Sequence, residues 1–201
     1  NVAPKFISSG EIVSYPAIIV EWINAKSLPE KLLKEHLCKI VDFIVRVNKI
    51  PVEPAKDLVE WKRDFFEIER REKDIEARVQ NGKNIHAFAE LIAELEPLLQ
   101  SGFQKLKILL KDIPQNVIMR PHFCYRDIGR ENIFTTEPHY IAVDWEWNTV
   151  SLSDPSFSLA VLIRRYKLNE QEIQIVFDEY DKHMPYPNLR QLVEARHLER
   201  T

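Results

Sequence analysis

The sequence predicts an α+β fold in which helices dominate and one small β-hairpin lies between helical regions. Apolar residues recur at helical spacing through most of residues 30–112 and again after residue 154. Short β-type runs are confined to the first 23 residues and to residues 117–147. A chain of 201 residues suits one globular domain or slightly more.

The first β-type runs are Phe6 to Ser8 and Ala17 to Ile23, which a Ser/Gly/Tyr-Pro connection joins as a hairpin. The second run, "AIIVEWI", is apolar enough that we expect it to be buried.

Three helical segments follow. Residues 29–50 carry apolar residues at helical spacing behind Pro29, and Pro51 ends the helix. Residues 57–80 are highly charged but keep an apolar stripe, so they predict a helix with one packed face, which "NGK" at residues 81–83 should break. Residues 85–99 predict another amphipathic helix.

Periodicity then changes to short β-type runs, "VIMRPHFCYRD", "ENIF" and "HYIAVDWEW", before helices resume. Asp154 before Pro155 predicts a helix N-cap with proline at the first helical position. Asn169 with Glu172 predicts a capping box for the next helix.

Composition excludes several classes of partner. A net charge of -3 and a pI near 6.1 provide no basic surface for nucleic acid, and no apolar run approaches the ~20 residues that cross a bilayer. Cys38 and Cys124 lie far apart in apolar surroundings, with no CxxC pair and no secretory segment at the start. We therefore expect reduced, buried thiols and a cytoplasmic protein without nucleic-acid or membrane partners; the oligomeric state is open.

Polar residues cluster in "CYRDIGRENIFTTEPHYIAVDWEW", residues 124–147. If the two apolar runs pair through a turn centred on Pro138, Ile133 faces Val143 and Asn132 faces Asp144. A one-residue slip would undo this register. In that register an amide oxygen and a carboxylate converge at one end of the hairpin.

Oxygen donors of this kind predict Mg²⁺, which takes one or two carboxylates together with substrate phosphates, rather than zinc. Asn132 and Asp144 are the candidate metal ligands, with Glu146 as a third candidate, and Asp127 lies near enough in the sequence to act as a base. Two structural alternatives stay open: turn-forming Asx residues for the three together, and a solvent-facing strand glutamate for Glu146.

These residues resemble a known pattern. "YRDIGRENIF" followed by "VDWEW" is similar to the catalytic loop and metal-binding segment of the protein-kinase-like phosphotransferases. The Asp-Trp-Glu sequence and the following "SDPSFSLA" favour the aminoglycoside phosphotransferase and choline kinase branch over protein kinases. "YPAIIVEWINAKSLPEKL" looks like the hinge of these enzymes, so the resemblance covers most of the chain.

The resemblance implies ATP and Mg²⁺ as co-substrate and cofactor. Asp127 would orient or deprotonate an acceptor hydroxyl, and Asn132 and Asp144, with Glu146 close by, would hold Mg²⁺ on the nucleotide phosphates. Backbone groups of Glu21 and Ile23 would bind adenine. The implied activity is transfer of a γ-phosphoryl group to a small hydroxyl compound such as an aminoglycoside or a choline-like amine.

Three departures from the pattern accompany the resemblance. Tyr125 stands where histidine is usual, and Ser158 replaces a usual aspartate. Neither a glycine-rich loop nor a strand lysine is identifiable, so we expect residues 1–23 to be the remnant of an N-terminal lobe with the hinge, and residues 24–201 to be a helical C-terminal catalytic lobe. A fragment of this kind would be inactive alone. The alternatives are a pseudokinase-like binding module and, less favoured, a protein kinase.

Overall fold

The structure is a computed structural model, and it describes residues 2–12, 15–53, 68–114, 117, 120–136, 138–145 and 150–198. Its strands are β1 (Phe6–Ile12), β2 (Tyr15–Val20), β3 (Lys26–Ser27), β4 (His122–Tyr125), β5 (Ile133–Thr135), β6 (Tyr140–Ala142) and β7 (Val150–Ser153). Its helices are α1 (Lys34–Asn48), α2 (Ile68–Lys83), the short 3₁₀ helix η3 (His86–Phe88), α3 (Ala89–Leu110), α5 (Ser156–Arg165), α6 (Glu170–His183) and α7 (Leu189–Leu198). The predicted α+β class with dominant helices is confirmed.

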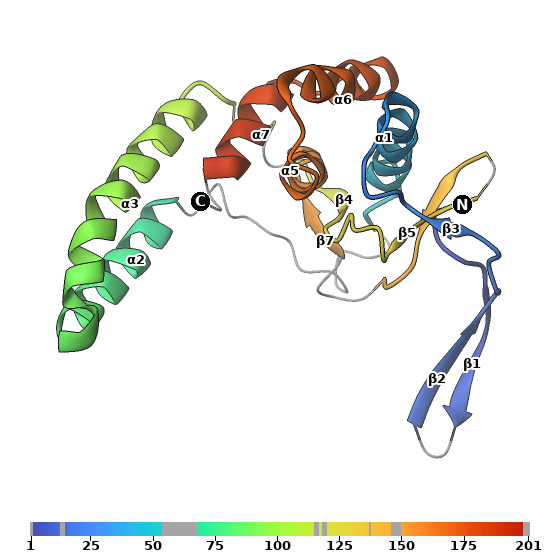
Figure 1. Cartoon of the computed structure of the whole chain (residues 1–201), viewed down its shortest axis with the longest axis horizontal. Coiled ribbons are helices and arrows are strands. Elements are labelled where there is room, and N and C mark those ends of the chain that lie inside the picture. The colour runs from blue at the N-terminus through green and yellow to red at the C-terminus, as the bar shows by residue number, and fades with distance from the viewer. Residues whose placement is uncertain are drawn as a thin grey trace.

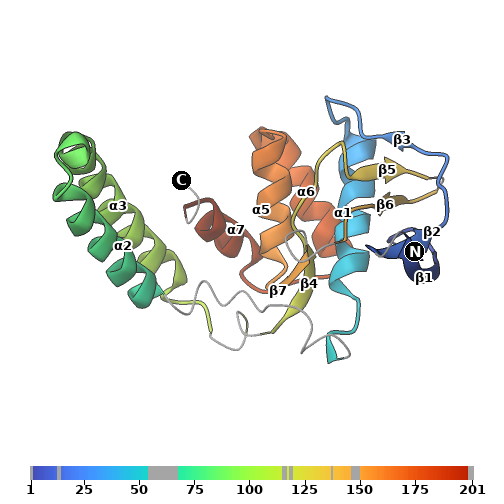
Figure 2. The same cartoon turned by 90° about the horizontal axis from the view of Figure 1, so that it is seen from below.

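The body of the molecule is a group of helices with small antiparallel sheets against it. Helix α1 packs on α6 and on β4, while α5 packs on α7 (Figures 1 and 2). The predicted apolar face of α1 forms the centre of the core, where Leu37, Ile40, Val41 and Ile44 are fully buried. The three-stranded sheet β3-β5-β6 lies beside α1, and β4 pairs with β7.

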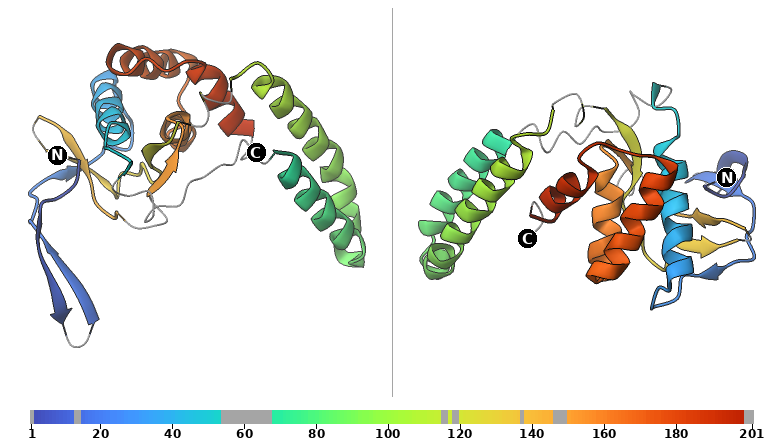
Figure 3. Two further views of the ribbon diagram at one scale, coloured as in Figure 1. Left: turned by 180° about the vertical axis from the view of Figure 1, so that it is seen from behind. Right: turned by 90° about the horizontal axis from the view of Figure 1, so that it is seen from above.

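Helices α2 and α3 form a two-helix arm that stands out from this body and reaches it through α7 (Figures 1 and 3). The predicted break at residues 81–83 is wrong by a few residues, because α2 continues through Lys83 and the chain turns only where the Ile85 N–H bonds the Gly82 carbonyl. The expected apolar stripe of α3 is half exposed, with Leu91 at 54% and Leu98 at 68%.

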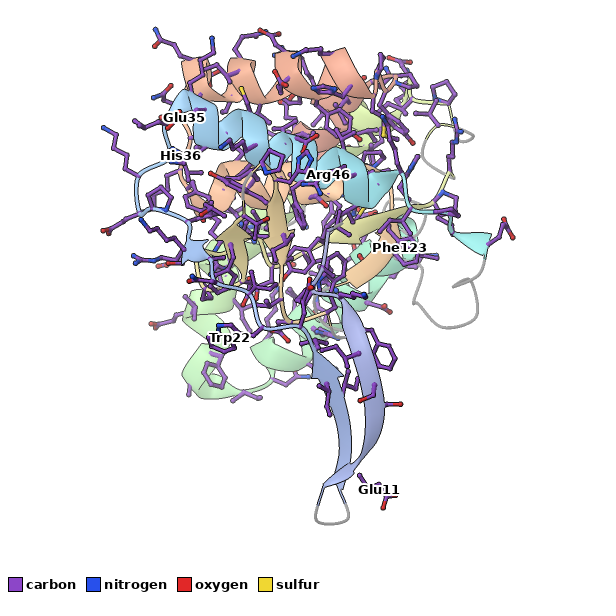
Figure 4. The ribbon with its side chains drawn as sticks, turned by 90° about the vertical axis from the view of Figure 1, so that its right-hand side faces the viewer. Glu11, Trp22, Glu35, His36, Arg46 and Phe123 are labelled. Carbon is purple, nitrogen blue, oxygen red and sulfur yellow. The ribbon has the colours of Figure 1, made fainter. Side chains whose placement is uncertain are left out.

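The N-terminal hairpin is present, but the expected burial of its second strand is wrong. Strands β1 and β2 pair antiparallel and project from the body, with Glu11 near the tip and Trp22 at the base (Figure 4). Ile18 is 71% exposed and Trp22 is 94% exposed. The two strands pack mainly on each other, so a two-stranded ribbon alone leaves these apolar side chains in water.

The predicted capping box of α6 is formed, whereas the predicted cap of α5 is wrong by one residue, because Pro155 occupies the N-cap position and the helix begins at Ser156. The Asn169 side chain accepts the backbone N–H groups of Gln171 and Glu172, and the Glu172 carboxylate accepts the Asn169 N–H. The Asp154 carboxylate accepts the N–H of Ser156, the first residue of α5. Asp154 also forms a buried ion pair. The Arg196 guanidinium of α7 lies 2.5 Å from its Oδ2, and both side chains are almost fully buried.

Burial of the thiols differs between the two cysteines. Cys124 is fully buried in β4, and this burial raises its pKa to about 12. Cys38 is only partly buried, and neither forms a disulfide. Within the described residues, no helix combines the length and apolar character that crossing a membrane requires.

Replacing Arg196 with alanine should destabilise the fold strongly. The change leaves the Asp154 carboxylate buried without its cation, which typically costs about 3–5 kcal/mol. The free energy of urea unfolding measures this. Arg190→Ala, an exposed arginine at the start of α7, is the matched control and should cost about 1 kcal/mol or less. Equal losses in the two variants would contradict the assigned role of the buried pair.

Stability should fall as the pH drops below neutral, in part because of His122. Burial lowers the pKa of His122, whose Nδ1 lies 3.0 Å from the Asn48 carbonyl and whose Nε2 is buried without a hydrogen bond in the described structure. The unfolded state therefore takes up the proton first, as the pH falls through about 6.5. His122→Asn should flatten the dependence of the unfolding free energy on pH between about 7.5 and 5. An unchanged slope would count against burial of the neutral ring.

Candidate active site

Asp127 lies in a short loop that leaves β4, residues 126–132, here called the Asp127 loop. Ile128 is fully buried and anchors the loop in the core. The carbonyl of Gly129 accepts N–H groups from Asn132 at 3.0 Å and Ile133 at 2.9 Å, so the loop closes tightly and leads into β5. The five-residue step from Asp127 to Asn132 is thereby folded into one compact turn.

The hairpin β5–β6 forms as predicted, but the predicted register is wrong by one residue. Ile133 pairs with Ala142 and Phe134 with Ile141, rather than with Val143 and Ala142. The cause is the turn, which is centred between residues 137 and 138 rather than on Pro138. Both the N–H and the hydroxyl of Thr136 donate to the His139 carbonyl and close a four-residue turn there.

In the observed register Asn132 lies opposite Val143, and Asp144 is one residue further along the chain. The Val143 N–H donates to the Asn132 carbonyl at 2.9 Å, which ties the two chain segments together at this end of the hairpin. Asp144 has a φ of 60°, so the alternation of a strand no longer sets the direction of its side chain. The backbones of the two predicted metal ligands therefore meet around one hydrogen bond despite the slip.

Asn132 is largely buried, at 8% exposure, and its side-chain amide forms no hydrogen bond within the described part of the chain. Its amide atoms are not among the fully buried atoms that lack a partner there, so the amide is open to solvent. Asp144 is exposed and Glu146 lies outside the described residues. Among the described residues, no group of three or more His, Cys, Asp or Glu could hold a metal ion.

Tyr125, which stands where histidine is usual in the pattern, braces this arrangement. Its hydroxyl donates to the Val143 carbonyl at 2.6 Å, and its ring packs on Phe43 and Trp145. The Ser158 hydroxyl, in place of the usual aspartate, donates to the Tyr125 carbonyl at 3.1 Å. Tyr125, the residue before the Asp127 loop, thus fixes the chain at Val143, just before Asp144.

The surroundings of the Tyr125 hydroxyl are acidic. Burial raises the pKa of Tyr125, and the carboxylates of Asp127, Asp144 and Glu131 raise it further. The hydroxyl therefore remains a hydrogen-bond donor at all physiological pH values. Asp127 follows Tyr125 by two residues and Asp144 follows Val143, so the two carboxylates belong to the segments that the Tyr125 hydroxyl joins.

Sequence reasoning missed Arg165 at the end of α5. Its Nη1 lies 2.9 Å from Asp127 Oδ1, and its Nη2 pairs with Glu131 Oε1. The side chain also lines a cavity of about 290 Å³ beside the loop, together with Glu30, Arg130, Glu131, Tyr166 and Lys167. The two consecutive arginines at a helix end were visible in the sequence, but nothing local indicates which loop they contact.

The two predicted adenine-binding residues lie together at a second cavity. Glu21 and Ile23 line a space of about 270 Å³ with Ala3, Thr136, Pro138, His139 and Ile141. The Glu21 N–H donates a hydrogen bond to the Lys5 carbonyl. The Glu21 carbonyl and the backbone of Ile23 have no backbone hydrogen-bond partner among the described residues. This volume is just below the roughly 300–1,000 Å³ of typical ligand sites.

Comparison with solved structures shows what this arrangement resembles. An aminoglycoside phosphotransferase from Alicyclobacillus acidocaldarius superposes with a TM-score of 0.71 at 15% identity, over 98% of this chain and 64% of its own. The choline kinase LicA from Streptococcus pneumoniae gives 0.59 at 18% identity, over 98% and 63%. The chain has the fold of aminoglycoside phosphotransferases and choline kinases. The resemblance predicted from the sequence is thus confirmed for the fold.

An AMP-bound spectinomycin phosphotransferase is also similar, with a TM-score of 0.67 at 13% identity, over 99% of this chain and 66% of its own. The chain therefore spans about two thirds of the length of such enzymes or slightly less. No protein-family profile matches the sequence, and no curated protein matches it.

Tyr125→Phe should destabilise the site while the matched variant Tyr166→Phe should not. The first change leaves the Val143 carbonyl without its donor, which typically costs about 1–3 kcal/mol in a buried setting. The Tyr166 hydroxyl is buried but has no hydrogen-bond partner in the described structure, so its removal should be neutral or slightly stabilising. Urea unfolding of both variants measures the difference, and equal effects would contradict the bracing role of Tyr125.

Proposed function

We propose that the chain forms the catalytic part of an ATP- and Mg²⁺-dependent small-molecule kinase. The observation that carries the proposal is that the Tyr125–Val143 and Val143–Asn132 hydrogen bonds join the two ends of the Asp127 loop to the segment that leads into Asp144. A chain with the fold of hydroxyl-phosphorylating enzymes has these three residues at the spacing that such chemistry uses.

The reaction is transfer of the γ-phosphoryl group to an acceptor hydroxyl. The acceptor oxygen forms a bond to the γ-phosphorus while the bond to the β-phosphate oxygen breaks, and ADP leaves. Asp127 orients the hydroxyl and receives its proton, which then passes to solvent. Catalysis of this kind consists mainly of positioning and charge stabilisation.

Asn132 and Asp144 supply a donor set that fits Mg²⁺. An amide oxygen and a carboxylate are hard ligands, and Mg²⁺ typically takes one or two protein groups along with phosphate oxygens and water. A site completed by the nucleotide needs no third acidic residue, in agreement with the described residues. The Asn132 amide, which forms no hydrogen bond within the described residues and is open to solvent, is available for this role, and Glu146 is proposed as a neighbour of the metal. Bound Mg²⁺ would neutralise phosphate charge during transfer.

The nucleotide base is proposed to bind at Glu21 and Ile23, in the cavity between the hinge and the β5–β6 turn. On this proposal residues 1–23 belong to an N-terminal lobe with the hinge, and residues 24–201 form the C-terminal catalytic lobe. Similar structures hold AMP, or ADP with spectinomycin. Those structures support nucleotide and a small hydroxyl compound as the ligands of the full-length protein, within the aminoglycoside-like or choline-like range.

A non-catalytic, nucleotide-binding or partner-binding module is the second candidate. Tyr125 in place of the usual histidine is the observation that favours it. The intact Asp127, Asn132 and Asp144 favour the kinase. An ATP-consumption screen of the full-length protein over aminoglycosides, choline, ethanolamine, homoserine and sugars separates the two functions, because a binding module consumes no ATP with any acceptor.

Two substitutions should have different effects on the full-length enzyme. Asp127→Asn should slow phosphoryl transfer by about 10²–10⁴-fold and leave binding of the Mg²⁺ nucleotide unchanged. Asp144→Asn keeps a residue that tolerates the left-handed backbone but removes the charge, and should weaken that binding about tenfold or more. Steady-state kinetics and calorimetry measure these effects.

Asp112→Ala, an exposed aspartate after α3, is the control and should behave as the wild type in both measurements. Unchanged turnover in Asp127→Asn would refute the assigned base. Unchanged nucleotide affinity in Asp144→Asn would refute the assigned ligand.

A further inference from the structure

A single guanidinium group holds both flanks of the Asp127 loop. Arg165 Nη1 lies 2.9 Å from Asp127 Oδ1, and Nη2 pairs with the carboxylate of Glu131, the residue before Asn132. Arginine presents its donors in a rigid planar fork, so the position of one carboxylate constrains the position of the other. The last residue of α5 thereby connects a core helix to the loop that carries the proposed base.

The loop backbone at Gly129 lies close to the Arg165 guanidinium. A Cβ atom at this position would lie 2.5 Å from Arg165 Nη2 and would also overlap the Glu131 carboxylate. The φ of Gly129 is not positive, so an L-residue could adopt its backbone conformation. An added methyl group would therefore require the Arg165 guanidinium and the Glu131 carboxylate, which are the ends of long side chains, to move.

Stability does not account for this contact. The side chains are 41% exposed for Arg165, 36% for Asp127 and 52% for Glu131, and ion pairs that face solvent contribute little to stability. The two contacts of the guanidinium instead fix the position of the Asp127 carboxylate. The guanidinium occupies Oδ1 of Asp127, whereas Oδ2 forms no hydrogen bond in the described part of the chain.

We propose that Arg165 is a positioning residue that holds the Asp127 carboxylate with its second oxygen toward the acceptor hydroxyl. The proposal rests on the proposed function. The cavity of about 290 Å³ that Arg165 lines also borders the loop at Arg130 and Glu131, so there is open space beside the loop for an acceptor. Arg165 acts through Asp127, so its loss should affect the transfer step rather than nucleotide binding.

Steady-state kinetics of the full-length protein test this proposal, with the acceptor found in the screen and with acceptor-independent ATP hydrolysis. Arg165→Ala should lower kcat about 10–100-fold, the size expected for a misplaced catalytic group, and leave the KM for ATP within about twofold. Arg165→Lys should restore part of the loss, because lysine keeps the charge but not the fork.

Arg164→Ala is the matched control, since Arg164 is exposed on the same turn of α5 and does not contact the Asp127 loop in the described structure. It should keep wild-type kinetics. A kcat in Arg165→Ala equal to that of Arg164→Ala, or a loss confined to the KM for ATP, would overturn the proposal. A wild-type protein that consumes no ATP would refute the proposed function itself and this role with it.

Gly129→Ala tests the same contact without changing any charge. The added methyl group should displace the guanidinium and lower kcat, by less than Arg165→Ala because the long side chain can shift. In the Arg165→Ala background it should have little further effect, because the two changes remove one interaction. Losses that multiply in the double variant would show that Gly129 acts independently of Arg165 and would contradict the coupling.

Discussion

The hydrogen bond from the Tyr125 hydroxyl to the Val143 carbonyl is the constraint on which the candidate site depends. Tyr125 ends β4, whereas Val143 follows β6, so the bond joins two segments that the sheets do not pair. Phe43 of α1 and Trp145 fix the ring, and Ser158 of α5 fixes the Tyr125 carbonyl. Without the hydroxyl, the Val143–Asn132 hydrogen bond would still hold the end of the Asp127 loop beside the segment of Asp144, but the start of the loop would lose its direct link to that segment.

Ion pairs lie at both ends of α5. At its start, the buried Asp154–Arg196 pair joins the helix to α7. At its other end, Arg165 contacts the partly exposed carboxylates of Asp127 and Glu131. Helix α5 thus carries a structural contact at its start and a contact with the proposed reacting group at its end. The buried pair favours rigidity, and the exposed fork leaves Asp127 accessible.

The sequence predicted best where the determinants are local. The Asn169–Glu172 capping box and the core face of α1 depend on residues within one helix, and both were confirmed. The predicted hairpin register was wrong because the turn closes at Thr136, whose N–H and hydroxyl both donate to the His139 carbonyl. The predicted burial of Trp22 was wrong because the apolar character of a segment does not show whether another layer of the protein covers it. Arg165 lies 38 residues from Asp127, and only the packing of α5 brings them together.

Asn132 and Asp144, as the proposed metal ligands, should jointly hold a metal ion on a nucleotide. Paramagnetic broadening by Mn²⁺, measured by NMR on the full-length protein with a non-hydrolysable ATP analogue, detects this joint binding. The Asn132 side-chain amide and the Asp144 backbone amide should broaden strongly only when Mn²⁺ and the nucleotide are both present. Signals that stay sharp in the ternary mixture, while remote signals broaden, would contradict it.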